Sequence, residues 1–510
     1  MRDCFRTGRW GSCPPTSPTG RWWRGTRRRL TSIRVPWTAS PPKRCSWRSG
    51  RRSPSVRPRA RSPEATARRV HGRWATGDNR PMPTVDLILA ERLDPSFKGF
   101  PPERAAFTVA EAGAQDLRLL RGDLPMPVAV LRESALRHNA DWLMRFVAAS
   151  GASLSPHGKT TNAPQLFAEQ LRDGAWGLTV ANVHQARLAV EAGARRVLMA
   201  NQLASVGDAA RWGALARAHA DVRFLTLTDS PAQLALLVEG LVRAGAPRTD
   251  VLVELGTPGG RTGCRDAASA IALAREVAAT PSLRLAGVEA FEGLNVSNDA
   301  ARDAAFVGAW MRALLELAAA CDREGLFAGL DEVLLSAGGS AAYDLVVGGL
   351  GGAALSRPVR IVLRSGCYLS HDDGMYRRHV AAIAARGAVH GEPPRGALEV
   401  WAAVQSRPEP DRAIVTLGRR DVGTDADLPV PKWWFRPGRD ARPAPAPAHW
   451  AVFGHNDQHG YLRVDAEDTL EVGDWIGFGV SHPCTTFDKW RLVWGIDDDG
   501  RVTRAIRTYF

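Results

Sequence analysis

The chain has 510 residues and a formal net charge of +14, a balance that would suggest a nucleic-acid ligand if it were spread evenly. Residues 1–81, however, hold 21 Lys and Arg against 3 Asp and Glu, so residues 82–510 carry a net charge of −4. This mildly acidic body argues against a nucleic-acid binder, and because no run of about 18 apolar residues occurs, we expect no membrane span. Four widely spaced cysteines in it are typical of reduced thiols in a cytoplasmic protein rather than of a disulfide framework: Cys264, Cys321, Cys367 and Cys484.

Residues 1–81 differ from the rest of the chain in composition. They are rich in Arg, Pro, Ser and Trp and lack an apolar run long enough to form a core. Three interpretations are open: an Arg-rich transit peptide, a disordered basic arm that contacts phosphates, or an upstream region read out of frame with Met82 as the true start. The Pro content disfavours the amphipathic helix of a transit peptide. We favour the last interpretation and leave this extension out of the fold prediction.

From Val128 to Leu369 short β-like runs alternate with longer Ala- and Leu-rich helical patterns, which predicts parallel strands joined by right-handed crossovers. A (β/α)8 barrel needs eight strands, so we assign the first of the nine runs to a neighbouring sheet and place the barrel domain at residues 82–378. The strand-like runs are 128–131, 154–157, 178–181, 197–200, 223–228, 251–255, 283–290, 333–337 and 360–363. Helical patterns cover 135–149, 165–172, 184–191, 231–244, 266–279 and 304–322.

After Leu369 the pattern changes. One helical segment, 376–385, precedes short runs bounded by Gly, Pro and Asp, which predict an all-β domain over residues 379–510. We interpret the Pro/Ala stretch 442–449 as an exposed loop or a crossover. The predicted strands are 398–405, 413–417, 450–453, 461–464, 475–480, 491–496 and 502–509.

The first candidate for chemistry is Lys159, which follows a strand-like run in the sequence Ser-Pro-His-Gly-Lys-Thr. An amine at the C-terminal mouth of a barrel strand can be desolvated and can form a Schiff base with an aldehyde cofactor. Taken alone, the stretch favours a solvated loop lysine. Polar or Gly-rich segments follow other strand-like runs as well, as a barrel active site requires: 182–184, 201–202, 254–263, 289–293, 336–340 and 364–368.

Two of these segments have the composition of a phosphate site. Ser336-Ala-Gly-Gly-Ser340 and Arg364-Ser-Gly-Cys-Tyr368 contain small residues that let backbone N–H groups approach an anion. We expect Ser340 to begin a helix whose dipole adds to the attraction. Each loop alone is a weak signal, because Gly is common in turns. Two of them, late in a barrel that also carries Lys159, favour phosphate binding.

A second type of site is predicted near the end of the chain, at His482 and Cys484. If the segment is extended, both side chains face the same way, and imidazole plus thiolate form a Zn²⁺ pair with positions open for water or substrate. The alternative is a buried Cys beside a strand-end His. The segment 454–460 holds a second polar cluster, for which the alternative is a turn with two solvated His.

Five motifs occur in an order that resembles the pyridoxal-phosphate enzymes with an alanine-racemase-like barrel, and within them the D-serine dehydratase and D-threonine aldolase family. The resemblance covers about residues 124–510. In that family position 365 is often Pro and position 458 often Glu, so Ser365 and Gln458 leave the exact substrate open. The motifs are Pro156-His157-Gly-Lys159-Thr160, Gly338-Gly-Ser340, Arg364-Ser-Gly-Cys-Tyr368, Asp457-Gln-His-Gly460 and His482-Pro-Cys484.

The resemblance implies a role for each motif. Lys159 is the Schiff-base lysine with His157 beside it in the active site, and His482 and Cys484 hold zinc or another divalent metal. The residues implied in binding the cofactor, pyridoxal 5'-phosphate, besides Lys159 are Arg261, Gly338, Gly339, Ser340, Arg364, Gly366, Cys367 and Tyr368.

The implied activity is β-elimination of D-serine or a similar D-β-hydroxy amino acid to a keto acid and ammonia. In the family, the metal motif of the aldolases looks like His-x-Asp, and that of the dehydratases looks like His-x-Cys. Cys484 therefore favours the dehydratase. Lys159 would remove the α-proton, the cofactor ring would hold the electrons and zinc would polarise the leaving hydroxyl. Two alternatives stay open: a metal-dependent D-threonine aldolase, and a cofactor-binding protein without turnover. We expect a cytoplasmic homodimer that takes a small D-amino acid and binds neither nucleic acid nor membrane.

Overall fold

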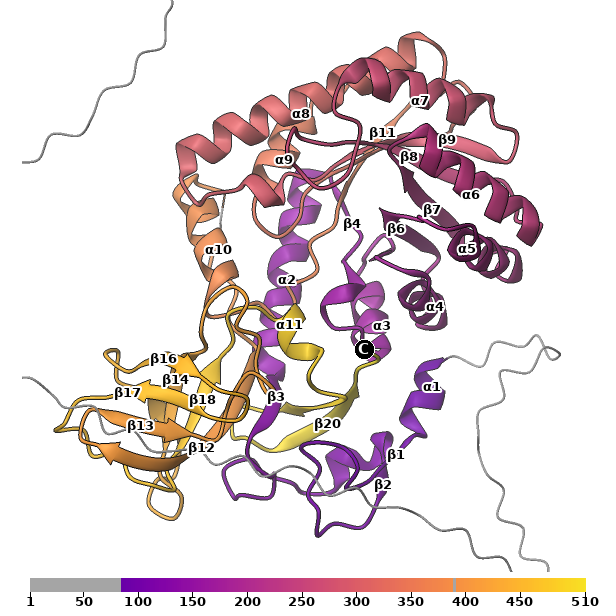
Figure 1. Cartoon of the computed structure of the whole chain (residues 1–510). Coiled ribbons are helices and arrows are strands. Elements are labelled where there is room, and N and C mark those ends of the chain that lie inside the picture. Colours follow the sequence, from indigo (N-terminus) through magenta and orange to yellow (C-terminus); the bar gives the residue numbers. More distant parts are fainter. Residues whose placement is uncertain (1–83, 389–390) are drawn as a thin grey trace, which may run out of the picture. The chain divides into compact units, whose positions relative to one another are not determined.

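The computed structural model describes residues 84–388 and 391–510, and the basic extension predicted for residues 1–81 lies outside them. Within this part of the chain, a parallel barrel and an antiparallel β region share the polypeptide (Figure 1). The predicted fold class, a barrel followed by β structure, is confirmed.

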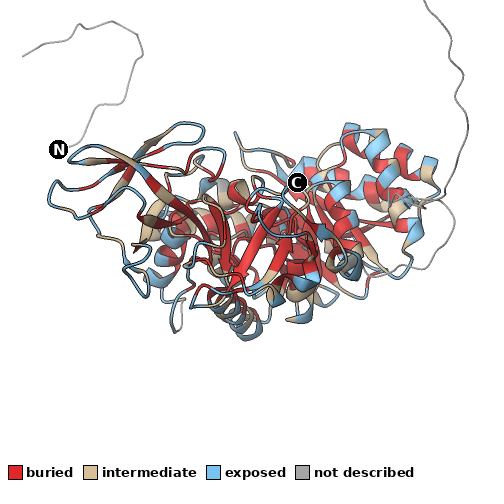
Figure 2. Ribbon diagram, turned by 90° about the horizontal axis from the view of Figure 1, so that it is seen from below, coloured by how far each residue is buried: buried red, intermediate tan, exposed pale blue. Residues whose placement is uncertain are grey.

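Eight parallel strands form the barrel, and they pair in one continuous path. Its two end strands meet where the backbone N–H groups of Trp176 and Thr179 donate to the carbonyl oxygens of Leu154 and Pro156, at 2.7 and 2.9 Å. This seam closes the barrel and directs the chain after the first strand to the barrel mouth. The strands, largely buried (Figure 2), are β4 (Ser153–Leu154), β5 (Leu178–Val180), β6 (Arg196–Gln202), β7 (Arg223–Thr228), β8 (Thr249–Leu255), β9 (Leu283–Ala290), β10 (Val333–Ser336) and β11 (Val359–Leu363).

Helices precede, connect and follow the barrel strands. They are α2 (Glu133–Ser150), α3 (Pro164–Arg172), α4 (Val183–Glu191), α5 (Val206–Ala218), α6 (Pro231–Ala244), α7 (Ala267–Ala279), α8 (Ala300–Arg323), α9 (Tyr343–Leu350) and α10 (Met375–Ala385). Ser205, Ser230, Asp266 and Asp299 cap four of them by accepting a hydrogen bond from the backbone N–H three residues on. The sequence did not predict α5, because glycines interrupt its apolar pattern, whereas the helix expected from Ser340 corresponds to α9, which begins three residues later.

One described helix, α8, is long and apolar enough to cross a membrane by length and composition. Its side chains Val307, Met311, Leu314 and Leu317 are fully buried and recur every three or four residues. This apolar stripe faces the neighbouring barrel elements. Packing against the barrel therefore accounts for the composition of α8.

The antiparallel region contains the first strand-like run, as predicted. Its strands are β3 (Val128–Arg132), β12 (Leu398–Glu409), β13 (Arg412–Val415), β14 (Val430–Phe435), β15 (Ala444–Pro445), β16 (Ala451–His455), β17 (Gly460–Arg463), β18 (Trp475–Gly479), β19 (Leu492–Ile496) and β20 (Val502–Arg507). β3 pairs with β12 antiparallel and with β19 parallel. The sequence analysis missed β14, whose pairing with β18 shifts register at Pro431, where the ladder lacks an N–H donor.

Residues that precede β3 also join the antiparallel region, although the sequence analysis grouped them with the barrel. Phe107 and Val109 share one hydrophobic core with Trp401 and Trp494. The region therefore draws on both ends of the described chain. Its N-terminal elements are α1 (Thr84–Leu89), β1 (Arg92–Leu93), β2 (Phe107–Thr108) and η1 (Val109–Ala114).

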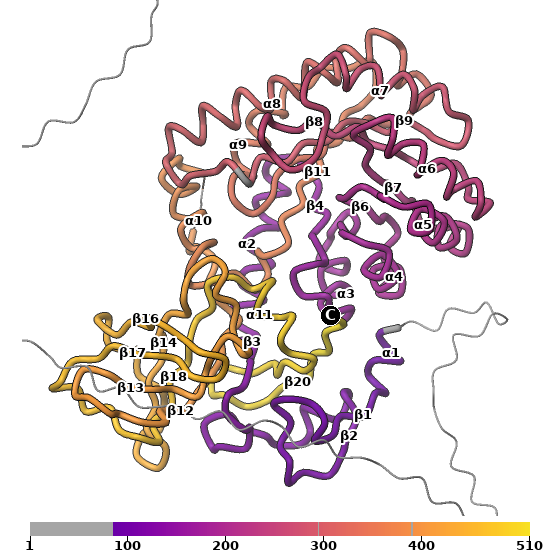
Figure 3. The backbone as a smooth tube through the Cα atoms, viewed as in Figure 1, coloured from indigo at the N-terminus to yellow at the C-terminus, as the bar shows by residue number. Residues whose placement is uncertain are grey.

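The last strand, β20, and the residues that follow it are attached to the barrel by hydrogen bonds of the backbone and of one side chain. The amide of Tyr509 donates to the carbonyl oxygen of Asn162 at 3.0 Å. The side-chain amide of Gln165 donates to Ala505 O at 2.9 Å and accepts from Arg507 N at 2.8 Å. The C-terminus accordingly lies beside α3 (Figure 3). These bonds fix the antiparallel region against the segment that follows β4.

A buried carboxylate, Glu399 on β12, lies in the centre of the antiparallel region. Arg132 Nε donates to it at 2.8 Å, and the indole N–H groups of Trp401 and Trp433 donate at 3.0 and 2.8 Å. Lys432 Nζ lies 3.4 Å away. Burial alone would raise the pKa of Glu399, but the positive charges of Arg132 and Lys432 hold it below its ordinary value. The carboxylate therefore stabilises the fold in its charged form.

Replacing Glu399 by Gln should lower the free energy of unfolding by about 3 kcal/mol at pH 7, because Arg132 and Lys432 then lose a buried counter-charge. The folded-state pKa lies below the ordinary value of 4.5, so this stabilisation is present above that pH and is lost as the pH falls through the folded-state pKa. The difference between wild type and variant should shrink accordingly, as measured by urea unfolding. Glu324→Gln, which removes an exposed pair with Arg275, should change stability much less. Equal effects of the two substitutions would contradict the role of Glu399.

Candidate active site

Lys159 lies at the barrel mouth, in the single turn η2 (Gly158–Thr160) that follows β4, and its side chain is exposed. Of the four lysines within residues 84–388 and 391–510, Lys98, Lys432 and Lys489 each form an ion pair. No ion pair or hydrogen bond of this part of the chain involves the Lys159 amine. The amine is therefore available for reaction.

His157 lies two residues before Lys159, on the seam that closes the barrel. Burial lowers the pKa of His157 well below its ordinary value, and the positive charges of Lys159, Arg364 and Arg261 act in the same direction. The ring is therefore an uncharged imidazole at neutral pH. Its Nδ1 atom is buried without a hydrogen-bond partner. A buried nitrogen of this kind fits a site built to receive a polar group.

The turn after β10 presents two backbone N–H groups to an anion. Gly338 adopts φ +87°, where an added Cβ would meet Leu363 at 2.6 Å. The N–H groups of Gly338 and Gly339 donate to the two carboxylate oxygens of Glu292 at 3.1 and 2.9 Å. Two adjacent amides that hold an oxyanion have the chemistry a phosphate requires. The geometry therefore fits the predicted phosphate site.

Ser340 does not begin a helix, contrary to the prediction. α9 begins at Tyr343, because Ala342 has φ −149° and ψ 31°, outside the helical region. Ser340 lies in the preceding turn, where it lines a small hollow with Ser365. The expected helix dipole is therefore three residues further along the chain.

Arg364 is held by the protein itself. Its guanidinium is paired with the Glu289 carboxylate and donates to Ser336 Oγ at 2.7 Å and to Ala290 O at 3.1 Å. Burial raises the pKa of Glu289 to about 8 against the attraction of Arg364. Arg261 differs: it is exposed on the loop after β8 and lies over Phe291, 5.1 Å from the ring centroid. Contact of either arginine with the cofactor stays a prediction.

The loop after β11 packs against the lysine turn. A Cβ added to Gly366 would lie 2.5 Å from the carbonyl oxygen of His157 and 2.8 Å from Thr160 Oγ1. Glycine is therefore needed here for a close approach of the two loops. The Tyr368 side chain points away into the core, where its hydroxyl accepts from Gln170 Nε2 at 3.2 Å.

Cys367 turns its thiol toward Cys484, and the two sulfur atoms lie 3.3 Å apart. Any contact of Cys367 with a phosphate would therefore involve its backbone. Burial raises the pKa of Cys367 well above its ordinary value. Hydrogen bonding with Cys367 and His482 lowers the pKa of Cys484 well below its ordinary value. The two thiols thus differ in charge, with Cys484 as the thiolate.

His482 and Cys484 come together in a turn and not on an extended strand, which corrects the prediction. α11 (Cys484–Phe487) begins at Cys484, and Pro483 has helical dihedrals of −61° and −42°. The fixed φ of proline suits the first turn of a helix. The two side chains meet nevertheless, and they are hydrogen-bonded to each other.

The pair has the donor chemistry of a zinc site. Asp425 Oδ2 lies 2.7 Å from His482 Nδ1, which leaves Nε2 of the imidazole for a metal. Burial lowers the pKa of His482, but Cys484 and Asp425 raise it to about 9. A metal that bound this imidazole would therefore displace a proton. No three His, Cys, Asp or Glu side chains of residues 84–388 and 391–510 are arranged around a metal position. Two protein ligands would leave open positions for water or substrate.

One side chain connects the pair to the lysine turn. Thr160 Oγ1 lies 3.5 Å from the sulfur atoms of both Cys367 and Cys484, and Thr160 follows Lys159 directly. Candidate metal ligands from the antiparallel region and the candidate cofactor lysine of the barrel thus belong to one site.

The second polar cluster lies on the β16–β17 hairpin. Asp457 and His459 are exposed, and Asp457 is 3.4 Å from Arg419. His455 Nε2 lies 3.3 Å from Thr424 Oγ1, next to Asp425 in the chain. The hairpin therefore supports the loop that carries Asp425.

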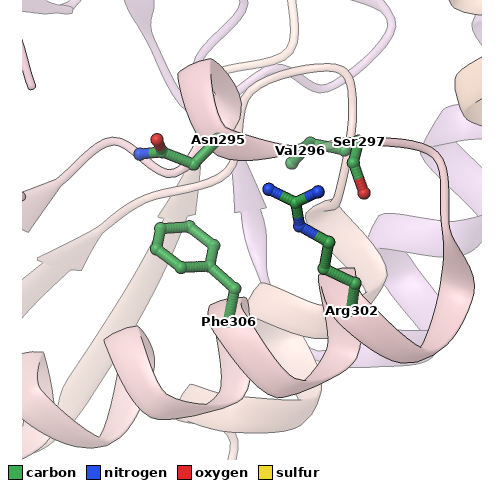
Figure 4. Close-up of a pocket in the computed structure, with 5 residues that line it drawn as sticks. All are labelled: Asn295, Val296, Ser297, Arg302 and Phe306. Atoms are coloured by element: carbon green, nitrogen blue, oxygen red, sulfur yellow. The ribbon is translucent and has the colours of Figure 1, made fainter. Parts of the chain in front are cut away.

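Other polar strand ends maintain the structure. Asn182 caps α4, His184 contacts Tyr509 O at 2.9 Å, and Gln202 donates to the Glu254 carboxylate. After β9 and η3 (Gly293–Asn295), the chain and α8 enclose a cavity of about 330 Å³. Arg302 and Phe306 project from α8 toward Asn295, Val296 and Ser297 there (Figure 4). The residues that line this cavity include none of the predicted catalytic groups.

Sequence reasoning did not single out Asp425 or the anion contact of Glu292. Asp425 lies in an irregular loop, with no spacing relative to His482 that could have indicated contact. Glu292 was included only as one of several polar residues that follow a strand-like run. Its position in a Glu-Gly pair close to β9 was the one available signal.

Comparisons with known proteins show what this chain is similar to. A family model described as "Putative serine dehydratase domain" matches residues 397–496. A D-threonine aldolase from Arthrobacter sp. is 29% identical over 378 residues, which cover 72% of this chain and 88% of that protein. The crystal structure of D-threonine aldolase from Filomicrobium marinum has a TM-score of 0.65 at 23% identity and covers 77% of this chain and 97% of that chain.

A further similar structure is D-threo-3-hydroxyaspartate dehydratase from Delftia sp. HT23. Its TM-score is 0.56 at 23% identity, with 78% of this chain and 99% of that chain covered. Similar structures of D-threo-3-hydroxyaspartate dehydratase also include a His-to-Ala variant and, two positions further on, a Cys-to-Ala variant in the metal-free form. The domain match, the relatives and the barrel neighbours agree with the motifs of the sequence: the chain is similar to the D-serine dehydratase and D-threonine aldolase family and has an alanine-racemase-like barrel.

Proposed function

We propose that this protein is a pyridoxal-phosphate-dependent, zinc-assisted lyase that eliminates water from D-serine or a similar D-β-hydroxy amino acid and yields a keto acid and ammonia. The family supports a pyridoxal-phosphate-dependent lyase of D-amino acids. The choice of elimination and of zinc rests on the residues of this chain. We also propose that it acts as a homodimer without a nucleic-acid or membrane partner.

The observation that carries the proposal is the contact between the His-x-Cys turn and the lysine turn. Cys484 Sγ and Thr160 Oγ1 lie 3.5 Å apart although their residues are 324 positions apart in the chain. A carrier of the cofactor has no use for a metal-ligand pair beside the reactive lysine. The contact therefore supports catalysis over simple cofactor binding.

The chain's own residues would bind the cofactor at two ends. The amides of Gly338 and Gly339 would hold the phosphate, which requires Glu292 to release them. Lys159 Nζ would hold the aldehyde carbon, and once the substrate amine has replaced it, Nζ can accept the α-proton. Bound pyridoxal phosphate supplies the sink for the electrons that this proton leaves behind.

The leaving hydroxyl calls for a second group. His482 and Cys484 would hold zinc, and Asp425 keeps the imidazole in the orientation that frees Nε2. Zinc would lower the cost of expelling hydroxide by polarising the substrate oxygen. The uncharged His157, with its unpartnered Nδ1, can accept or donate a hydrogen bond in the site without adding positive charge.

Retro-aldol cleavage is the second candidate, favoured by the similarity to a D-threonine aldolase and a 3-hydroxy-D-aspartate aldolase. That reaction deprotonates the β-hydroxyl, whereas elimination expels it. The resemblance associates His-x-Cys with the dehydratases. Cys484 therefore favours elimination.

Product analysis tests the proposal directly. The protein loaded with pyridoxal phosphate and zinc should convert D-serine to pyruvate and ammonia, a chelator should stop the reaction, and added zinc should restore it. Cleavage of D-threonine to glycine and acetaldehyde at a rate above any keto-acid formation would show an aldolase instead. Full activity in the chelator would refute the metal assignment.

Borohydride reduction should fix the cofactor on one lysine. With pyridoxal phosphate bound, peptide mapping should find the label on Lys159, because the amines of Lys98, Lys432 and Lys489 are held in ion pairs. Lys159→Ala should lose the label, and Lys489→Ala should keep it. A label on any of the three paired lysines would contradict the assignment.

Cys484→Ala should separate cofactor binding from elimination. The variant should keep the visible absorbance of the bound cofactor, because Lys159 and the Gly338–Gly339 amides lie on the barrel. Its rate of D-serine elimination should fall by about two orders of magnitude or more, since a few kcal/mol of charge stabilisation are lost. Zinc content should fall in parallel. Cys321→Ala, a buried cysteine on α8, is the matched control; normal zinc content in Cys484→Ala would overturn the ligand assignment.

A further inference from the structure

Cys367 and Cys484 form a pair of free thiols from two distant parts of the fold. Cys367 lies on the loop after β11 of the barrel, and Cys484 is the first residue of α11 in the antiparallel region. Their sulfur atoms are 3.3 Å apart, and both residues are reduced. A disulfide bond needs about 2.05 Å, so a small approach of the two sulfur atoms would bring them to bonding distance.

The surroundings distinguish this pair from the other thiols of the described chain. Cys484 is partly exposed, whereas Cys367 is 4% exposed. A solute would therefore reach Cys484 first and find Cys367 directly behind it. Cys264 and Cys321 are buried, the Cys264 thiol donates to the carbonyl oxygen of Asp229 at 3.2 Å, and neither sulfur contacts another sulfur atom within residues 84–388 and 391–510.

We propose that Cys367 and Cys484 are an oxidation site, at which a peroxide converts the two thiols to a disulfide that removes Cys484 as a metal ligand. In the first step the Cys484 sulfur attacks one peroxide oxygen, the O–O bond breaks, and sulfenic acid and water form. In the second step Cys367 attacks that sulfur and expels the oxygen as a second water. In total, two thiols and one hydrogen peroxide yield one disulfide and two waters.

The site's position gives this oxidation a consequence. A disulfide would occupy the sulfur that the proposed zinc needs and would covalently join the barrel loop to the His-x-Cys turn. The effect on metal rests on the proposed function, while formation of the disulfide does not. Zinc bound to Cys484 should in turn slow the oxidation, because a coordinated sulfur is a weaker nucleophile.

The test is peroxide treatment of the full-length, metal-free protein, followed by thiol counting and peptide mapping. We expect loss of two thiols, a cross-linked peptide that contains Cys367 and Cys484, and retention of the Cys264 and Cys321 thiols. Zinc affinity should fall at least 100-fold and return after treatment with a dithiol. Preloading with zinc should slow cross-linking at least several-fold. Failure of the cross-link to form, or a cross-link between other cysteines, would overturn the proposal.

Cys367→Ser separates an oxidisable neighbour from a metal ligand. In its reduced form the variant should bind zinc within about twofold of wild type, and peroxide should give no intramolecular cross-link. Loss of zinc affinity in the reduced variant would assign Cys367 to the metal and refute its role as a resolving thiol. If reduced wild type binds no zinc while the cross-link still forms, the metal part of the proposed function fails and the oxidation site stands.

Discussion

The hydrogen bonds between the end of β20 and the segment after Lys159 are the constraint on which the site depends. Tyr509 and Asn162 are joined through backbone and side chain, and Gln165 both donates to and accepts from β20. β20 pairs with β19, which follows α11 in the chain. The turn with His482 and Cys484 is thereby held at a fixed position over the barrel mouth, because the strand that follows it cannot shift without breaking these bonds.

The candidate site contains few charged side chains. Three carboxylates, Glu254, Glu289 and Glu292, lie at the ends of β8 and β9, where Arg364 is paired with Glu289 and the Gly338 and Gly339 amides hold Glu292. Among the groups that can carry a positive charge, Lys159 forms no ion pair within the described residues, and His157 is held in its neutral form. A phosphate that bound here would have to displace the Glu292 carboxylate from the two amides, because both anions need the same N–H donors.

The sequence predicted the barrel well, because short buried strands alternate regularly with longer helices and polar or Gly-rich loops follow the strands. It could not locate β14, where Pro431 interrupts the strand pattern, or α5, where glycines weaken the helical pattern, and it placed the start of α9 three residues too early, at Ser340. Lys159 and the Gly-rich turn were found because their chemistry is local. Asp425 was not, because its contact with His482 depends on the folding of an irregular loop that leaves no periodic signal.

His482 and Cys484 lie side by side as predicted, although the local structure on which that prediction relied was wrong. An extended strand places residues i and i+2 on one side, and the sequence analysis relied on that geometry. Pro483 instead starts a helical turn, and the two side chains meet through their hydrogen bond and the Asp425 contact. The spacing alone therefore predicted the pair, whereas the position of the pair over Thr160 required the tertiary structure.

The candidate site is divided between the barrel and the antiparallel region. The junction between them therefore sets how the two groups of residues lie relative to each other. The Gly338–Gly339 amides and Lys159 move with the barrel, and the His482–Cys484 pair moves with the antiparallel region. A shift of about 1 Å between reacting groups can cost about 100-fold in rate. The junction resists such a shift through directional contacts: Arg504 pairs with Glu133 at 2.6 Å and also with Glu169, both on barrel helices. Either proposed reaction acts on the β-oxygen of the substrate, which would lie between Lys159 on the barrel and His482 and Cys484 on the antiparallel region, so this junction, more than the barrel core, has to be built accurately.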